Sequence, residues 1–370
     1  MDPPIIIGGG FAGLSNAYFI QGSTLYEEHD KVGFPQHCTG LVSRRVIKIL
    51  GSLAEETILG YYKRIVIKDL ELKTLSILNI REGVYRVDRV KLENLLKEEA
   101  ENRGSLIMMN KKILDINASS KETCISILDY YDHDVKKTCF SNRIIVIADG
   151  VTGFISRRFS KKSKDLYLGL QGFQEKGSYH IDPEEIIVFV DDRIFPGYFG
   201  WAIPVSERKM LIGGAWPLKY RDKRRLMKLF TRILMKKSVI KDEKIYNMFG
   251  GLINRDFDKT FHKPNIVLAG DAAGFVKPFT GGGLYTSLYQ VLSIKNSLDR
   301  ASEYTDFENL YIRHLRPIIS QLYLQRKFTE LTYKIGLERF VRNILRISDI
   351  FLGIEIDYDY YILPRSLNNI

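Results

Sequence analysis

The hydrophobic and polar positions along the chain predict an α/β protein with two kinds of sheet. Runs of mostly β-branched apolar residues at 4–7, 143–147 and 265–268 are typical of parallel strands that are buried on both faces. Residues 64–80 instead alternate between apolar and polar side chains, which predicts a pair of half-buried strands. From 165 to 216 the chain is β-rich, with Tyr, Phe and Gly throughout, and we expect an antiparallel sheet suited to an apolar ligand.

Helices are predicted where apolar residues recur at helical spacing, often after a glycine-rich turn. The predicted helices lie at 14–19, 43–51, 89–100, 154–159, 220–235 and 284–294. Residues 306–353 are also predicted to be helical, and Arg339, Arg342 and Arg346 share one face there. This segment is either an amphipathic helix packed on the body or a basic helix on a membrane surface.

The first predicted strand leads directly into a glycine-rich turn. Gly8, Gly10 and Gly13 match the pattern G-x-G-x-x-G, with Phe11 and Ala12 between the last two, and a helix follows. In this pattern the glycines form the tight turn, allow backbone contact with a pyrophosphate and seat the helix on the strand. Glu27 ends the next strand at the spacing of a ribose-binding carboxylate, with Glu28 as its neighbouring competitor. We interpret the turn as a dinucleotide site, although a purely structural βα turn is the alternative.

A second glycine-rich junction lies about 260 residues further along. The strand at 265–268 runs into Gly270-Asp271, and a loop with Pro278 and Gly281-Gly282-Gly283 then opens a helix at Leu284. Asp271 is a candidate acceptor for a ribityl hydroxyl. The backbone N–H groups of the three glycines could stabilise negative charge on a reduced flavin ring.

Three further segments hold candidate residues. The loop Pro35-Gln36-His37-Cys38-Thr39-Gly40 could reach the reactive ring of a cofactor, or it could be a structural loop with an inert thiol. Arg89, at a predicted helix start, is either a surface arginine or a clamp for phosphate. Asp149-Gly150 follows another buried strand.

The composition narrows the class of protein. With 370 residues, 45% apolar and 27% charged, the chain is globular, and no apolar run is long enough to span a bilayer. We expect a cytoplasmic protein without a signal peptide or a metal site. The odd number of cysteines argues against disulfides, so Cys124 and Cys139 are interpreted as packing residues. The net charge of +11 suits phosphates or lipid headgroups, and without a nucleic-acid-binding module we expect no nucleic-acid partner.

These motifs, in this order, resemble the FAD-dependent geranylgeranyl reductase family, a branch of the flavoproteins with the p-hydroxybenzoate hydroxylase fold. The resemblance covers residues 4–300. The family's motifs appear as Gly8–Gly13, Pro35–Gly40, Arg89–Leu96, Ala148–Gly153, Tyr198–Pro204 and Gly270–Gly283. This chain departs from them at Leu92-Glu93, where the family has Phe-Asp, at Gly153, where it has Ser, and at Trp201, which follows one extra residue.

The resemblance implies a Rossmann-like FAD-binding domain, an antiparallel substrate domain and a helical C-terminal region. The expected FAD domain comprises 1–60, 84–164 and 262–300, the substrate domain 61–83 and 165–261, and the helical region 301–370. FAD would lie with its adenosine on Glu27, its phosphates at Gly8–Gly13 and Arg89, and its ring at Gly281–Gly283. The candidate catalytic residues are Cys38, Tyr198 and Trp201.

The expected function is reduction of isoprenoid double bonds, such as those of geranylgeranyl chains on membrane glycerophospholipids. NADPH or ferredoxin would supply electrons, and peripheral contact with a membrane would fit the substrate. The alternatives are a flavin monooxygenase acting on an aromatic or prenylated substrate and a non-catalytic escort for prenylated molecules.

Overall fold

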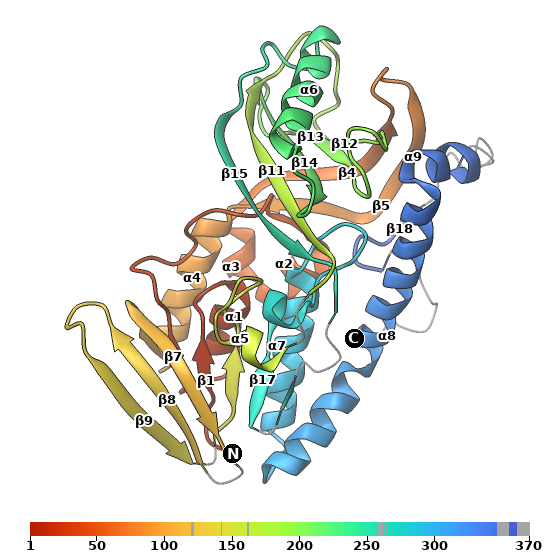
Figure 1. The fold of residues 1–370 in the computed structure, drawn as a ribbon. Coiled ribbons are helices and arrows are strands. Elements are labelled where there is room, and N and C mark those ends of the chain that lie inside the picture. The colour runs from red at the N-terminus through yellow and green to blue at the C-terminus, as the bar shows by residue number, and fades with distance from the viewer. Residues whose placement is uncertain are drawn as a thin grey trace.

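A six-stranded sheet organises the lower half of the molecule (Figure 1). The computed structural model describes residues 1–119, 122–141, 143–160, 163–257, 262–263, 265–345 and 355–360. In spatial order the strands are β16 (His262–Lys263), β17 (Ile266–Leu268), β10 (Ile145–Ile147), β1 (Ile5–Ile7), β2 (Thr24–Tyr26) and β6 (Leu106–Met108). All pairs are parallel except β16 with β17. The carboxyl ends of β1, β10 and β17 therefore lie side by side, and each leads into a candidate motif.

Helices cover this sheet because its central strands are apolar on both faces. The fully buried Leu14 and Leu288 join the strands in one continuous core. The helices are α1 (Phe11–Phe19), α2 (Arg44–Leu50), α3 (Ser52–Glu55), α4 (Arg89–Asn102), α5 (Ser156–Phe159) and α7 (Leu284–Leu298), with a short 3₁₀ turn, η1 (Gly270–Ala273). The predicted helices are thus present, although α5 begins at Ser156 rather than at residue 154.

A larger sheet forms the upper half and carries α6 (Lys223–Lys236) on one face (Figure 1). Its strands are β15 (Tyr246–Asn254), β11 (Leu166–Glu175), β14 (Lys209–Pro217), β13 (Gly200–Pro204), β12 (Glu185–Phe189), β4 (Ile58–Lys68), β5 (Thr74–Val87) and β18 (Glu355–Ile356), with β3 (Leu41–Ser43) on β5. The predicted strand pair is β4 and β5. Most pairs are antiparallel as expected, but β12–β4 and β18–β5 are parallel.

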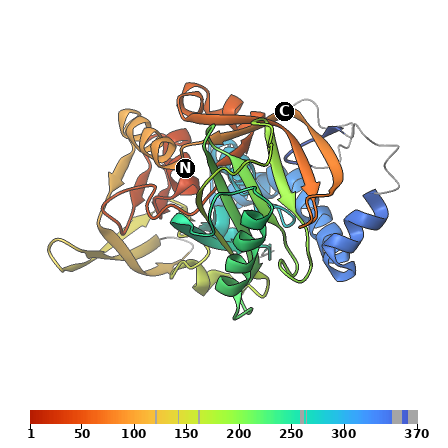
Figure 2. The same ribbon diagram turned by 90° about the horizontal axis from the view of Figure 1, so that it is seen from above.

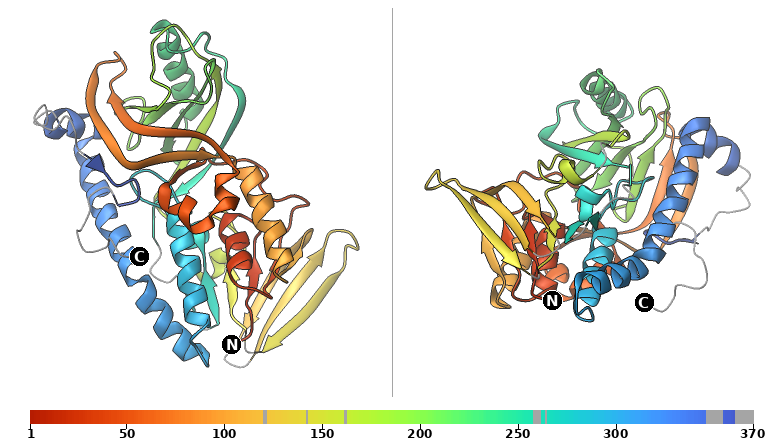
Figure 3. Two further views of the ribbon diagram at one scale, coloured as in Figure 1. Left: turned by 180° about the vertical axis from the view of Figure 1, so that it is seen from behind. Right: turned by 60° about the horizontal axis from the view of Figure 1, so that its bottom comes forward.

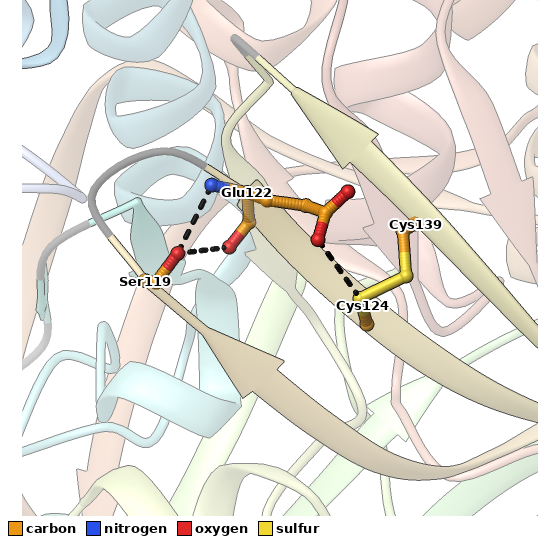
Figure 4. The surroundings of a disulfide bond; sticks show 4 residues. All are labelled: Ser119, Glu122, Cys124 and Cys139. Carbon is orange, nitrogen blue, oxygen red and sulfur yellow. Dashed lines mark hydrogen bonds between the residues drawn. A yellow bond between two sulfur atoms is a disulfide. The ribbon is translucent and has the colours of Figure 1, made fainter.

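A three-stranded sheet of β7 (Lys111–Ala118), β8 (Glu122–Asp129) and β9 (Val135–Ser141) lies at one side of the molecule, opposite the C-terminal helices (Figure 2). Cys124 and Cys139 lie directly opposite one another on β8 and β9 and form a disulfide (Figure 4). The expectation that they are packing residues is therefore wrong. An odd cysteine count does not exclude a bridge, because the third cysteine, Cys38, is simply left as a free thiol.

The C-terminal region is mainly helical, with the long α8 (Tyr304–Ile335), the short α9 (Leu337–Phe340) and a π-helical turn, η2 (Val341–Leu345). Contrary to the helical prediction, it also contributes the strand β18. Arg342 pairs with Asp69 at 2.8 Å and with Glu338 at 3.0 Å, and Arg346 lies outside the described residues, so the basic face of three arginines remains a prediction. Among the described residues, no helix is long and apolar enough to cross a bilayer. The division into domains remains a prediction.

Candidate functional site

The turn after β1 has the geometry of a nucleotide-binding turn. Gly8 has φ of +100°, and a Cβ there would lie 2.5 Å from the Ala148 carbonyl oxygen. A Cβ on Gly13 would lie 1.9 Å from the Gly8 carbonyl oxygen, so α1 can approach the turn this closely only with glycine. A Cβ on Gly10, by contrast, would meet no atom within 4 Å. Open space above Gly10 fits the close approach of a pyrophosphate to the backbone.

Glu27 lies at the end of β2 and turns toward this glycine-rich turn. Its buried carboxylate accepts hydrogen bonds from the backbone N–H groups of Gly9 and, at 2.8 Å, of His29. These contacts fix the carboxylate and leave acceptor capacity for ribose hydroxyls. Glu28 is partly exposed and pairs with Lys112 at 2.7 Å. The structure therefore favours Glu27 over Glu28 as the residue that faces the ribose.

Arg89 is held next to the turn at the start of α4. Its guanidinium lies 5.1 Å from the centre of the Phe11 ring and pairs with Glu93 and Cys38. Burial lowers the pKa of Arg89, but these two partners outweigh burial and raise it overall. Its Nε is buried without a hydrogen-bond partner in the described part of the chain. An unsatisfied cationic N–H beside the glycine-rich turn fits a phosphate oxygen.

The departure from the family at Leu92-Glu93 has a clear consequence in the structure. Glu93 lies one helical turn after Arg89, and its carboxylate accepts the Arg89 Nη2 hydrogen bond. Leu92 is completely buried in the core of the parallel sheet. With Leu-Glu at these positions, Glu93 therefore orients the Arg89 guanidinium, and Leu92 fills the core.

Asp149 mainly shapes the backbone after β10. Its Oδ2 accepts the N–H groups of Ile155 and Ser156 at 2.9 and 3.0 Å. A Cβ on Gly153 would lie 2.0 Å from the Asp149 carboxyl carbon, so the carboxylate in this position requires glycine at 153. Gly150 adopts φ of +76° and borders open space. Burial raises the pKa of Asp149, and Oδ1 has no partner among the described residues, which suits a polar ligand group.

The second glycine-rich junction packs directly on the first. A Cβ on Gly270 would lie 2.7 Å from the Cβ of Ala12, at the start of α1. Asp271 follows, and its carboxylate borders Gly283, whose Cβ would lie 3.2 Å from Oδ1. Surrounding protein raises the pKa of Asp271, and the charges of Arg89 and His37 oppose this rise, although the side chain keeps solvent contact. The Gly8–Gly13 turn and the Gly270–Gly283 segment, about 260 residues apart in the sequence, thus form one continuous polar surface, which we call the polar track.

The larger upper sheet contacts both the loop that holds Cys38 and the loop of Gly281–Gly283, which we call the glycine loop. His37 Nδ1 lies 3.1 Å from the Gly250 carbonyl oxygen of β15, so the loop that holds Cys38 contacts the larger sheet. The amide N–H of Gly40 donates to Cys38 Sγ at 3.4 Å. From the other side, a Cβ on Gly281 would lie 2.6 Å from the Tyr198 hydroxyl. The sheet therefore closes over the glycine loop where the flavin ring is expected.

The Tyr198 hydroxyl is buried and has no hydrogen-bond partner among the described residues. Burial raises the pKa of Tyr198, while the positive charge of Arg255 opposes the rise, so the hydroxyl keeps its proton at neutral pH. Trp201 belongs to the same aromatic cluster, but its indole N–H donates to Gln171 at 3.2 Å within the sheet. Tyr198 therefore contacts the glycine loop, whereas the contacts of Trp201 are within the sheet.

The remaining candidate residues lie in these same segments. Thr39 belongs to the cysteine loop and Gly282 to the glycine loop, Pro278 is buried just before it, and Leu284 is the first residue of α7.

The sequence analysis missed a buried group of charges beneath the glycine loop. Lys277 Nζ donates to the Tyr358 carbonyl oxygen at 2.8 Å and to Asp359 Oδ1 at 3.3 Å. Arg45, on α2, donates to Asp357 at 2.9 Å. Burial lowers the pKa of Lys277, and Asp359 and Asp357 oppose this effect. A charged residue in an otherwise apolar loop, and the run Asp357–Tyr360, were the signals that could have indicated this cluster.

The fold and the two joined glycine junctions are those of the FAD-dependent flavoproteins. An uncharacterized protein of Methanocaldococcus jannaschii is 26% identical over 358 residues, which cover 94% of this chain and 84% of that protein. A digeranylgeranylglycerophospholipid reductase of Methanococcus vannielii is 22% identical over 292 residues, or 76% of this chain and 72% of the reductase. The crystal structure of a geranylgeranyl bacteriochlorophyll reductase-like protein from Thermoplasma acidophilum matches with a TM-score of 0.82 at 17% identity, covering 95% of this chain and 92% of that one. No protein-family model matches the chain.

These similarities confirm the resemblance to the geranylgeranyl reductases and the expected fold class. The class of protein is an FAD-dependent oxidoreductase. An FAD-dependent halogenase and a p-nitrophenol 4-monooxygenase share the fold, so the fold alone does not identify the reaction.

Proposed function

We propose that the protein is an FAD-dependent reductase that saturates C=C bonds in the geranylgeranyl chains of membrane glycerophospholipids. The observation that carries this proposal is the contact of the larger sheet with Gly281, where the apolar Ile253 and the Tyr198 hydroxyl, which has no hydrogen-bond partner among the described residues, meet the glycine loop. The same sheet contacts the Cys38 loop through His37 and Gly250 of β15. Named reductases of such lipids among the relatives support the choice of substrate.

The residues that would hold FAD follow the polar track. Glu27 accepts the ribose hydroxyls of the adenosine, while the turn Gly8–Gly13 and Arg89 bind the pyrophosphate. Asp271 accepts hydrogen bonds from the ribityl chain. The Gly281 N–H donates to the Lys277 carbonyl oxygen at 2.8 Å, so within Gly281–Gly283 the N–H groups of Gly282 and Gly283 would stabilise negative charge on the reduced flavin ring.

The two neighbouring carboxylates provide a test of the adenosine position. Replacing Glu27 with glutamine removes a charged acceptor, and we expect the dissociation constant for FAD to rise by about tenfold or more. The matched variant Glu28→Gln, which alters only a partly exposed ion pair with Lys112, should bind FAD as the wild type does. Fluorescence titration of the apoprotein measures both constants. Equal affinity in the two variants would remove Glu27 from the ribose site.

Reduced FAD, when bound, supplies a hydride to one carbon of the alkene. The protein must then deliver a proton to the other carbon and hold the double bond in place, because an isolated alkene has no carbonyl that a hydrogen bond could polarise. Cys38 is the residue that we assign to this face of the ring, where its S–H can donate or relay the proton. Tyr198, with its protonated hydroxyl against Gly281, is the second group that can hold a proton there.

The proposal is tested by anaerobic turnover. The flavin-loaded protein, reduced with dithionite, is mixed with a digeranylgeranyl glycerophospholipid, and the product is analysed by mass spectrometry. We expect the lipid to gain two hydrogens for each bond reduced, without oxygen. Dithionite replaces the physiological donor, for which we propose reduced ferredoxin or NADPH.

The two alternatives give different products in the same experiment. A monooxygenase would form product only when oxygen is admitted, and its product would gain an oxygen atom. A non-catalytic escort would bind the lipid and return it unchanged under all conditions. Either outcome would overturn the proposed reduction.

A further inference from the structure

The outer face of α8 carries an apolar stripe in its C-terminal half. Leu324 is 63% exposed, Leu331 57%, and Phe328 and Ile335 40% each. At about 100° per residue these four positions fall within about 60° of the helix circumference. The buried face of α8, which includes Leu322 and Thr329, lies to one side of this arc. We call these four residues the α8 stripe. A contiguous apolar stripe of this kind marks a contact surface.

Basic residues border the stripe on the flank away from the buried face. Arg316, Lys327 and Lys334 are exposed and lie about 60–80° around the helix from Leu324. Lys327 is 3.5 Å from Glu330, whereas Arg316 and Lys334 form no ion pair in the described part of the chain. An apolar face edged by lysine and arginine is typical of helices that lie in the interface of an anionic bilayer.

The stripe is continuous with the candidate site. The Phe328 ring lies 5.8 Å from the ring of Phe279, which stands in the loop between Pro278 and Gly281. Phe279 in turn lies 6.5 Å from Phe199, the neighbour of Tyr198. Figures 1 and 3 show α8 along the outside of the molecule, reaching from the base of the parallel sheet to the upper sheet. Packed aromatic rings thus connect the surface of α8 with the loop that holds Gly281.

We propose that the α8 stripe docks on the surface of an anionic lipid bilayer, with Arg316, Lys327 and Lys334 on the headgroups. Charge complementarity favours a bilayer over a second copy of the chain. In an antiparallel pair of α8 helices the basic flanks would face one another and repel. The inference builds on the proposed function, because a bilayer-bound α8 would hold the candidate site next to the membrane that carries the lipid substrate.

The test is flotation with vesicles of phosphatidylcholine, alone or mixed with phosphatidylglycerol. We expect the FAD-loaded protein to float with the anionic vesicles and less so at high salt. The variant Leu324→Asn/Leu331→Asn should lower the partition coefficient by at least about tenfold. The control Leu218→Asn/Leu229→Asn removes two comparably exposed leucines near and on α6 and should partition as the wild type does. Thermal melts verify that all variants fold.

Two results would contradict the proposed docking surface. In the first, the wild-type protein floats with neither kind of vesicle. In the second, the stripe variant and the control variant have the same partition coefficient. A wild-type protein that self-associates in a stripe-dependent way and ignores vesicles would assign the stripe to a second copy and overturn the proposal as well. Flotation is measured without turnover, so failure of the reductase assay leaves this result intact. Conversely, the stripe variant should keep wild-type activity on detergent-solubilised lipid and lose it on vesicle-embedded lipid.

Discussion

Replacing Cys38 with alanine should reduce anaerobic turnover at least about tenfold while FAD remains bound. Cys38 stands between Arg89 and the Gly40 amide, in the loop that contacts β15, and we assign it to the alkene side of the ring. Arg89 keeps Glu93 as its partner in the variant, so the phosphate site should be preserved. The measurement is kcat with dithionite-reduced protein, together with the flavin absorbance of the same sample.

A matched variant distinguishes a role of Cys38 in proton transfer from a role in packing. Cys38→Ser keeps a small group with an ionisable proton and should retain more activity than Cys38→Ala, with a changed dependence on pH. Full turnover in a yellow Cys38→Ala protein would remove this thiol from the mechanism. Tyr198 would then be the remaining group at Gly281 that can hold a proton.

Replacing Asp359 with alanine should lower the free energy of unfolding by about 3–5 kcal/mol. Lys277 and Asp359 are almost completely buried, so the change removes the paired carboxylate from a buried ammonium group. The same lysine lies in the loop before Gly281, and its amide N–H donates to the Gly282 carbonyl at 2.9 Å. We therefore expect weaker FAD binding as well as lower stability. Urea unfolding and FAD titration measure the two effects.

The control for this variant is an exposed ion pair. Lys241 and Glu175 lie 2.8 Å apart with both side chains more than half exposed, and Lys241→Ala should cost less than about 1 kcal/mol. The double variant Lys277→Met/Asp359→Leu removes both buried charges and should recover much of the lost stability. Equal losses in Asp359→Ala and Lys241→Ala would show that the buried pair does not hold the C-terminal segment in place.

The glycine junctions could be predicted from the sequence because their requirements are local. Gly8 needs a positive φ and Gly13 a close approach to a carbonyl, and no other residue type meets these demands. The buried strands before them are equally local signals, since parallel strands covered on both faces read as apolar runs. Glu27 could be placed because its spacing from Gly8 reflects the length of one βαβ unit.

The missed features depend on contacts between distant residues. The Cys124–Cys139 bond requires the register of β8 and β9, which a cysteine count does not contain. Lys277 and Asp359 meet only because β18 returns to pair with β5. The sequence pattern predicts an exposed Arg342, but its guanidinium forms an ion pair with Asp69, which is distant in the sequence. The spacing of apolar residues predicts which face of a helix or strand is buried, but not which distant residues that face contacts.

The central claim is that two distant glycine junctions hold one FAD, and flavin content tests it most directly. The protein is purified in the folded state, its absorbance spectrum is recorded, and the cofactor released on denaturation is identified by chromatography. We predict a yellow protein that releases a stoichiometric amount of FAD, or an apoprotein that regains it on titration. A folded, colourless protein that takes up no FAD offered in excess would contradict the account.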